Sequence, residues 1–134
     1  MIRRKINIAG WEGVFLFSTG GYDDEEIYRQ LVSCDAPASV FHSVSANLAE
    51  GMMNEGFTFS SPPLRRSVVY FGPTTDGGQF MSTFCHELGH FAIDICVTDG
   101  VDLESEKLCY LAGEVALRLS DIVCHLACDH CREV

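Results

Sequence analysis

One pentapeptide, HELGH from His86 to His90, combines residue types that could bind a metal and hydrolyse a substrate. Residues four apart lie on one face of a helix, so His86 and His90 would direct both imidazoles to one point. This spacing provides two zinc ligands from a single rigid element. Glu87 lies one position along, where its carboxylate could reach a water on the metal and act as general base. The alternative interpretation is two ordinary helix histidines.

A hydrolytic zinc site takes three protein ligands and leaves one position to water, so a third ligand is expected from another element. Asp94 lies four residues after His90 on the same helix, so we expect it either to support the site without binding metal or to be solvated. Glu106 is favoured because Gly89 and Gly113 would let two helices approach closely. The other downstream candidates are Asp99, Asp102, Glu104 and Glu114, of which Glu104 and Glu114 rank next and the two aspartates are more typical of helix caps.

The segment from HELGH to SEKLCYLAGEV resembles a family of small zincin metallopeptidases found in phages and mobile elements of bacteria. The pattern is similar to that of gluzincins and, more distantly, to that of IrrE/ImmA-type metallopeptidases. The resemblance is specific at the two metal motifs and loose over the rest of the chain. It implies a minimal zincin-like fold in which Glu106 is the third zinc ligand. The positions that match around Glu106 are Tyr110, Leu111 and Gly113, whereas Lys107 and Leu108 depart from the pattern.

A peptidase site also needs a donor for the oxyanion and a place that binds the peptide. A donor for the developing oxyanion is expected, and Tyr70, Tyr110 and His42 are the candidates. Their ordinary alternatives are core aromatic residues and a surface histidine. The strand RRSVVYF, which precedes the HELGH helix, is interpreted as an edge strand that holds an extended peptide by main-chain pairing.

The C-terminal segment IVCHLACDHCREV is dense in thiols and imidazoles. Four of its residues could hold a second zinc ion: Cys124, Cys128, His130 and Cys131. The spacing does not match a zinc finger. The alternative is a helix end whose cysteines pack as small apolar residues.

The pattern of apolar residues and turn residues along the chain predicts an α+β fold, with strands early and long helices late. Strands are expected at 11–18 and 65–72, the second covered on both faces because its apolar run is unbroken. Helices are expected at 25–32, from 39 to about 54, at 78–97 and at 103–127. Gly56 and the pair Pro62–Pro63 indicate a loop. The 78–97 helix should bury a stripe made of Phe80, Phe84, Leu88, Phe91 and Ile95.

Length and composition limit the remaining choices. A chain of 134 residues is expected to form a single domain spanning 1–134. The net charge of −10 excludes general nucleic-acid binding, and no run approaches the roughly 18 apolar residues of a membrane span. Seven cysteines, an odd number, and no signal peptide favour the cytoplasm of a bacterial or phage-infected cell.

The function expected is that of a zinc-dependent metallopeptidase with one catalytic Zn²⁺ and a peptide or protein substrate. The alternative is a zinc-binding interaction protein that uses a zincin-like fold with little or no proteolysis. The sequence does not indicate an oligomeric state.

Overall fold

A mixed four-stranded sheet with helices on both faces forms the fold of this α+β protein, seen here in a computed structural model that describes residues 1–20, 23–49 and 56–132. The strands are β1 (Ile2–Ile8), β2 (Trp11–Phe17), β3 (Phe57–Ser61) and β4 (Arg66–Phe71). Their order in the sheet is β1-β2-β4-β3. The outer pairs are antiparallel, and the central pair β2–β4 is parallel.

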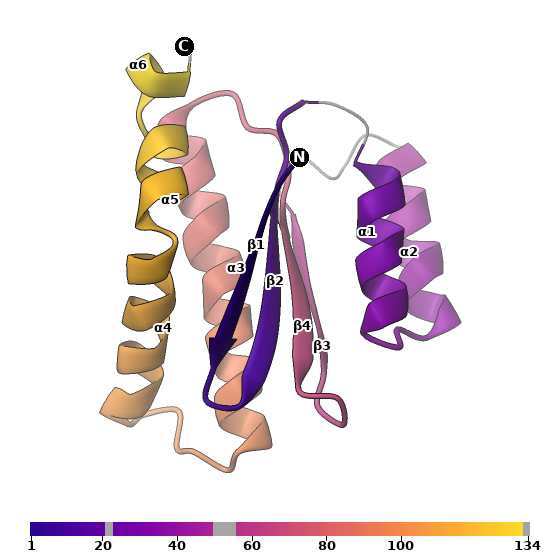
Figure 1. Cartoon of the computed structure of the whole chain (residues 1–134), viewed down its shortest axis with the longest axis vertical. Helices are drawn as coiled ribbons and strands as arrows, with labels where there is room; N and C mark the ends of the chain where they lie inside the picture. Colours follow the sequence, from indigo (N-terminus) through magenta and orange to yellow (C-terminus); the bar gives the residue numbers. More distant parts are fainter. Residues whose placement is uncertain (21–22, 50–55, 133–134) are drawn as a thin grey trace.

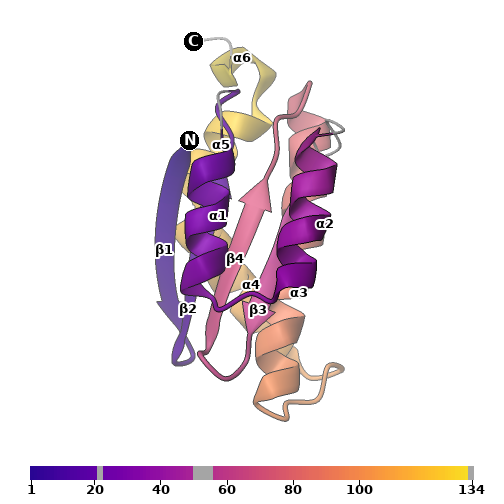
Figure 2. The same ribbon diagram turned by 90° about the vertical axis from the view of Figure 1, so that its right-hand side faces the viewer.

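The helices form two layers, one on each side of the sheet (Figure 1). The pair α1 (Asp24–Ser33) and α2 (Ala38–Ala49) covers one face, and Figure 2 shows both in front of the strands. The other face is covered by α3 (Gly77–Thr98), α4 (Glu106–Arg118) and α5 (Ser120–Ala127), followed by the short α6 (Asp129–Arg132). Within the described residues, no helix is both long and apolar enough to cross a membrane.

The central helix α3 lies on the sheet through the apolar stripe expected from the sequence, and all five stripe residues are buried. Phe91 is fully buried and packs edge-on against Phe15 of β2, with ring centroids 5.1 Å apart. Gly13 of β2 makes this packing possible, because a Cβ at that position would lie 2.8 Å from atoms of both rings. The rotation of α3 about its axis is thereby fixed by a close contact with β2.

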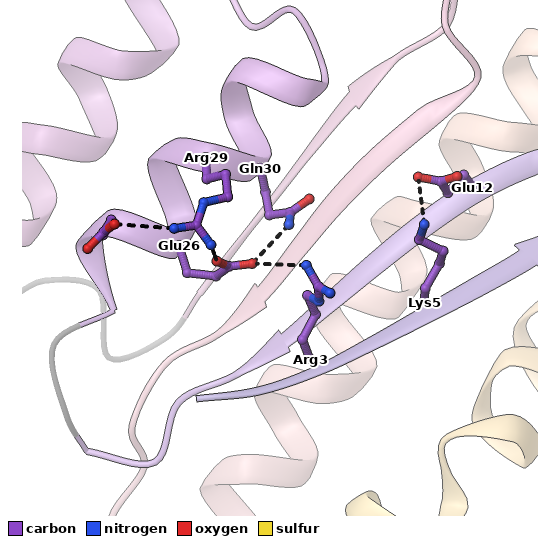
Figure 3. Close-up of polar contacts among 7 residues, drawn as sticks. Arg3, Lys5, Glu12, Glu26, Arg29 and Gln30 are labelled. Atoms are coloured by element: carbon purple, nitrogen blue, oxygen red, sulfur yellow. Dashed lines mark hydrogen bonds and ion pairs between the residues drawn. The ribbon is translucent and has the colours of Figure 1, made fainter.

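The opposite face of the sheet holds a second core, and α1 is also tied to this face by polar contacts (Figure 3). Glu26 of α1 accepts hydrogen bonds from Arg29 at 2.7 Å and Gln30 at 2.9 Å. Its carboxylate also lies 3.5 Å from the guanidinium of Arg3 on β1. The Arg3–Glu26 pair joins the first helix to the first strand, and the two hydrogen bonds within α1 orient the Glu26 carboxylate.

Most elements expected from the sequence are present, with small shifts at their ends. The strands at 11–18 and 65–72 are β2 and β4, and the helices at 25–32 and 78–97 are α1 and α3. The helix expected from Ser39 begins one residue earlier as α2, and its expected end at 50–54 lies outside the described residues. The single helix expected at 103–127 is divided into α4 and α5 at Leu119, whose side chain is buried at the junction.

Two strands were not expected, and one changes the interpretation of the sheet edge. Basic residues hide the alternation of β1, and β3 lies in the stretch expected to be a loop. β4 pairs with β2 on one side and β3 on the other, so RRSVVYF is a central strand. The prediction that it is the peptide-binding edge strand is therefore wrong. Its burial on both faces is confirmed, with Val68 and Tyr70 in one core and Val69 and Phe71 in the other.

The close contact at Gly13 gives a first testable prediction. In Gly13→Ala, the added methyl group must displace the buried rings of Phe15 and Phe91, and we expect the free energy of unfolding to fall by about 1–3 kcal/mol. Urea unfolding measures the change. Gly113→Ala in α4 is the matched control, because a Cβ there meets no atom within 4 Å and should stabilise the helix by up to about 1 kcal/mol. Equal stability of Gly13→Ala and the wild type would show that this contact does not fix α3.

Candidate metal site

The two histidines of HELGH converge on the exposed side of α3, away from its buried stripe. The Nε2 atoms of His86 and His90 lie 3.2 Å apart, and the rings are inclined by 79°. Zinc–nitrogen bonds of 2.0–2.1 Å to both atoms would span this separation with an N–Zn–N angle of about 100°, near the tetrahedral value. The pair therefore fits two coordination positions of one zinc ion. Without a metal, the same distance accommodates one N–H···N hydrogen bond.

Glu87, between the histidines, points toward the sheet and not toward solvent. Its side chain is buried with 5% of its surface exposed. The hydroxyl of Thr58 on β3 donates to Glu87 Oε1 at 2.9 Å and contacts the Glu87 carbonyl at 3.2 Å. One turn of α3 therefore presents two exposed imidazoles beside a buried carboxylate whose orientation is restricted by β3.

A cavity of about 300 Å³ joins the two parts of this arrangement. It lies between the first half of α3 and the residue before β3. Its lining is mostly polar and comprises Gly56, Gln79, Ser82, Thr83, His86 and Glu87. Because His86 and Glu87 line the same hollow, a molecule in it would contact one candidate ligand and the candidate base together.

Asp94, one turn beyond His90, joins α3 to the sheet through a chain of hydroxyl groups. Ser60 of β3 donates to Asp94 Oδ2 at 2.6 Å and contacts Ser67 of β4 at 2.7 Å. The indole of Trp11 donates to Ser67 at 2.9 Å. Asp94 is therefore hydrogen-bonded to the sheet and not simply solvated, and its expected support of the metal site stays a prediction.

The third ligand expected from the sequence is not assembled beside the histidines. Across residues 1–20, 23–49 and 56–132, no three His, Cys, Asp or Glu side chains lie together in a way that could hold one metal ion. Glu106 is exposed at the first residue of α4. The glycine argument for Glu106 is wrong, because a Cβ at Gly89 or Gly113 would meet no atom within 4 Å and neither marks a close helix approach.

The other acidic candidates have local partners near the ends of α3 and α4. Asp99 ends α3 and forms an ion pair with Arg65 at 2.8 Å. The Arg65 guanidinium lowers the pKa of Asp99. Asp102 accepts a hydrogen bond from the amide of Glu104 at 3.0 Å, and Glu114 pairs with Arg118 at 3.0 Å. These acidic side chains therefore have the contacts of helix caps and ion pairs.

The oxyanion-donor candidates are not gathered beside the histidines. Tyr70 belongs to the core on the opposite face of the sheet, because adjacent strand residues point to opposite faces, and its hydroxyl donates to Asp23 at 2.9 Å. Burial, with the Asp23 carboxylate, raises the pKa of Tyr70. Tyr110 on α4 is 74% exposed, and His42 is exposed on α2 in the other helical layer.

The cysteine-rich end is also only partly assembled. Cys124 and His130 are exposed, on α5 and α6, and no third ligand joins Cys128 and Cys131 within the described part of the chain. The four residues expected to share a second zinc ion are therefore not grouped around one point.

Sequence reasoning missed Thr58 and Ser60, which connect α3 to the sheet. A signal was present in FTFSS, where two phenylalanines alternate with Thr58 and Ser60. Such alternation indicates a strand with one apolar and one polar face. The polar face could not be assigned to Glu87 and Asp94 without knowing that β3 lies beside α3.

Comparison with known proteins adds no family: no family model, curated protein or solved structure matches this chain.

The hydrogen bond from Thr58 to Glu87 gives a second testable prediction. In Thr58→Val, the side-chain shape is kept but the buried carboxylate loses a donor, so we expect about 1–3 kcal/mol less stability toward denaturant at pH 7. Thr58→Ser keeps the hydroxyl and should lose less. If the two variants unfold at the same urea concentration, the hydroxyl does not hold Glu87.

Proposed function

We propose that this chain is a zinc-dependent metallopeptidase with a zincin-like fold, in which His86 and His90 bind zinc and Glu87 is the general base. The observation that carries the proposal is the 3.2 Å separation of the two Nε2 atoms on a helix that also buries the intervening glutamate beside a cavity. A structural zinc site has no use for a carboxylate next to an open coordination position. This combination favours hydrolysis over a purely structural metal.

Glu106 is the proposed third ligand, on the basis of the family resemblance. Its exposed carboxylate begins α4, which packs beside α3. Because Glu106 is not grouped with the histidines, this part of the proposal requires the first turn of α4 to move toward them when zinc binds. Metal sites often form fully only with the ion, since binding is coupled to folding of the ligand-bearing segments.

The proposed reaction assigns separate tasks to the metal and to the side chains. When bound, zinc would supply a Lewis acid that lowers the pKa of a bound water to about 7 and polarises the scissile carbonyl. Glu87 takes a proton from the attacking water and delivers it to the departing amine. Thr58 restricts the rotation of the Glu87 carboxylate, and Glu87 lines the same cavity as His86.

The edge strand β3 is the proposed binding place for an extended peptide. It pairs only with β4 among the described strands, so its outer edge is open to main-chain pairing. Thr58 connects this strand to Glu87, and a second hollow of about 290 Å³ lies between β3 and α2. Val40, Val44 and Phe59 are among its lining residues. Apolar substrate side chains are therefore favoured on the α2 side of β3.

The alternative function is a zinc-binding interaction protein with little or no proteolysis. The specific observation in its favour is the lack of a grouped third ligand among the described residues. A two-histidine site could complete its coordination with a side chain of a bound partner. For either function, the seven free thiols support a reducing cytoplasm, of a bacterial or phage-infected cell, as the proposed location.

Zinc affinity provides the third testable prediction. His86→Ala and His90→Ala should each weaken zinc binding by at least about 100-fold, because each removes one of the convergent imidazoles. Glu87→Gln should bind zinc within about threefold of the wild type, since Glu87 is not a ligand. Isothermal titration calorimetry with ZnCl₂ measures the zinc affinity of all three variants.

His42→Ala is the matched control, because His42 is an exposed helical histidine on the other layer. It should leave zinc affinity unchanged. Retained affinity in both His86→Ala and His90→Ala would contradict the site. Glu106→Gln tests the third ligand separately: a loss comparable to that of the histidine variants supports it, and no loss favours the interaction protein.

Loss of activity in Glu87→Gln is the fourth testable prediction. Proteins from cells that express the wild type should show new peptide N-termini, and the rate of their appearance should fall by at least about 100-fold in Glu87→Gln. Mass spectrometry of labelled N-termini measures this rate at matched expression levels. Identical N-termini in the two strains, with zinc still bound by both proteins, would exclude proteolysis and leave the interaction function.

A further inference from the structure

The end of the chain places two thiols on one helical turn, away from the histidine pair. Cys128 and Cys131 are separated by two residues in the sequence CDHC. Cys128 directly precedes α6 and Cys131 is the third residue of that helix, and a hydrogen bond from the Arg132 amide to the Cys128 carbonyl at 3.1 Å closes the turn that holds both. Cys128 is exposed, whereas Cys131 is half-buried. An accessible thiol and a partly shielded one therefore lie three positions apart on one turn, where side chains are neighbours.

This segment is held in place by contacts on both sides of the pair. Asp129 accepts a hydrogen bond from the Gly77 amide at 2.6 Å, at the start of α3. Gly77 has no room for a side chain, because a Cβ would lie 1.9 Å from the Ala127 carbonyl oxygen. Arg132 donates to the Leu126 carbonyl at 3.1 Å and to Thr74. The two thiols are thus fixed relative to each other and to α3.

We propose that Cys128 and Cys131 form a redox-active dithiol that exchanges with a low-molecular-weight disulfide such as glutathione disulfide. The proposal is independent of the zinc function. Two thiols on one helical turn suffice for a disulfide once their sulfurs approach, whereas a metal site needs further ligands, and no third one is grouped with them among the described residues.

The exchange proceeds in two balanced steps. The Cys128 thiolate attacks one sulfur of glutathione disulfide, which breaks that S–S bond, forms a mixed disulfide and releases one glutathione thiolate. Cys131 loses its thiol proton and attacks the Cys128 sulfur, which releases the second glutathione. Two electrons pass from the protein to the glutathione disulfide. The two protons lost by the protein thiols are taken up by the two released thiolates.

The surroundings of Cys128 favour its role as the attacking thiol. Hydrogen bonds from the Cys131 amide and thiol lower the pKa of Cys128, and the same thiol contact raises the pKa of Cys131. By contrast, burial raises the pKa of Cys34 to about 11. Thiolates are the reactive form, so Cys128 should react faster than the buried cysteines.

A redox titration of the full-length protein in glutathione buffers tests the proposal. After acid quenching, differential alkylation and tandem mass spectrometry would locate each oxidised cysteine. We expect a Cys128–Cys131 disulfide that forms reversibly with a single midpoint, and faster alkylation of reduced Cys128 than of exposed Cys109 by roughly threefold or more. Independent glutathionylation of the two thiols, or a disulfide between other cysteines, would overturn the proposal.

Three variants and a metal measurement complete the test. Cys131→Ser should accumulate a mixed glutathione disulfide at Cys128, because the resolving thiol is absent, and Cys128→Ser should form neither species at this site. Cys109→Ser is the matched control and should titrate like the wild type. Stoichiometric zinc that is lost in Cys128→Ser, together with no disulfide in zinc-free buffer, would overturn the dithiol in favour of a metal site.

Discussion

The contact between α3 and the sheet determines where the candidate functional side chains of α3 lie. Phe91 packs against Phe15 over a position that only glycine fits, and the rest of the apolar stripe extends this contact along the helix. With the stripe held against β2 and β4, the helical period leaves His86 and His90 on the exposed side. Glu87 is turned toward β3. A different rotation of α3 would bury the imidazoles or expose the carboxylate.

The boundary between α3 and β3 is polar where most of the helix–sheet interface is apolar. Glu87 contacts Thr58, and Asp94 contacts Ser60 two turns later. Burying a carboxylate costs free energy unless charged or hydrogen-bonded partners compensate, and a threonine hydroxyl is a neutral donor. An apolar residue at position 87 would pack at lower cost. The retained carboxylate therefore supports a chemical role for Glu87, because stability alone does not favour it.

Local patterns in the sequence predicted the parts of the structure that depend on local physics. Helical periodicity identified the buried face of α3, and an unbroken β-forming run identified β4 as covered on both faces. The four-residue spacing of His86 and His90 predicted their convergence, since both belong to one helix. The arrangement of elements that lie far apart in the sequence was harder to predict. Strand order made β3 the edge and β4 central, and the neighbour of Glu87 proved to be Thr58. Neither follows from spacing along the chain.

The central claim is that the two imidazoles of HELGH share one zinc ion. Anomalous diffraction from crystals of the zinc-loaded protein, collected on both sides of the zinc absorption edge, tests it most directly. We expect an anomalous peak at roughly 2.0–2.1 Å from Nε2 of both His86 and His90, with the Glu87 carboxylate outside the coordination shell. Zinc bound elsewhere, with the two Nε2 atoms still in direct contact at 3.2 Å, would contradict it.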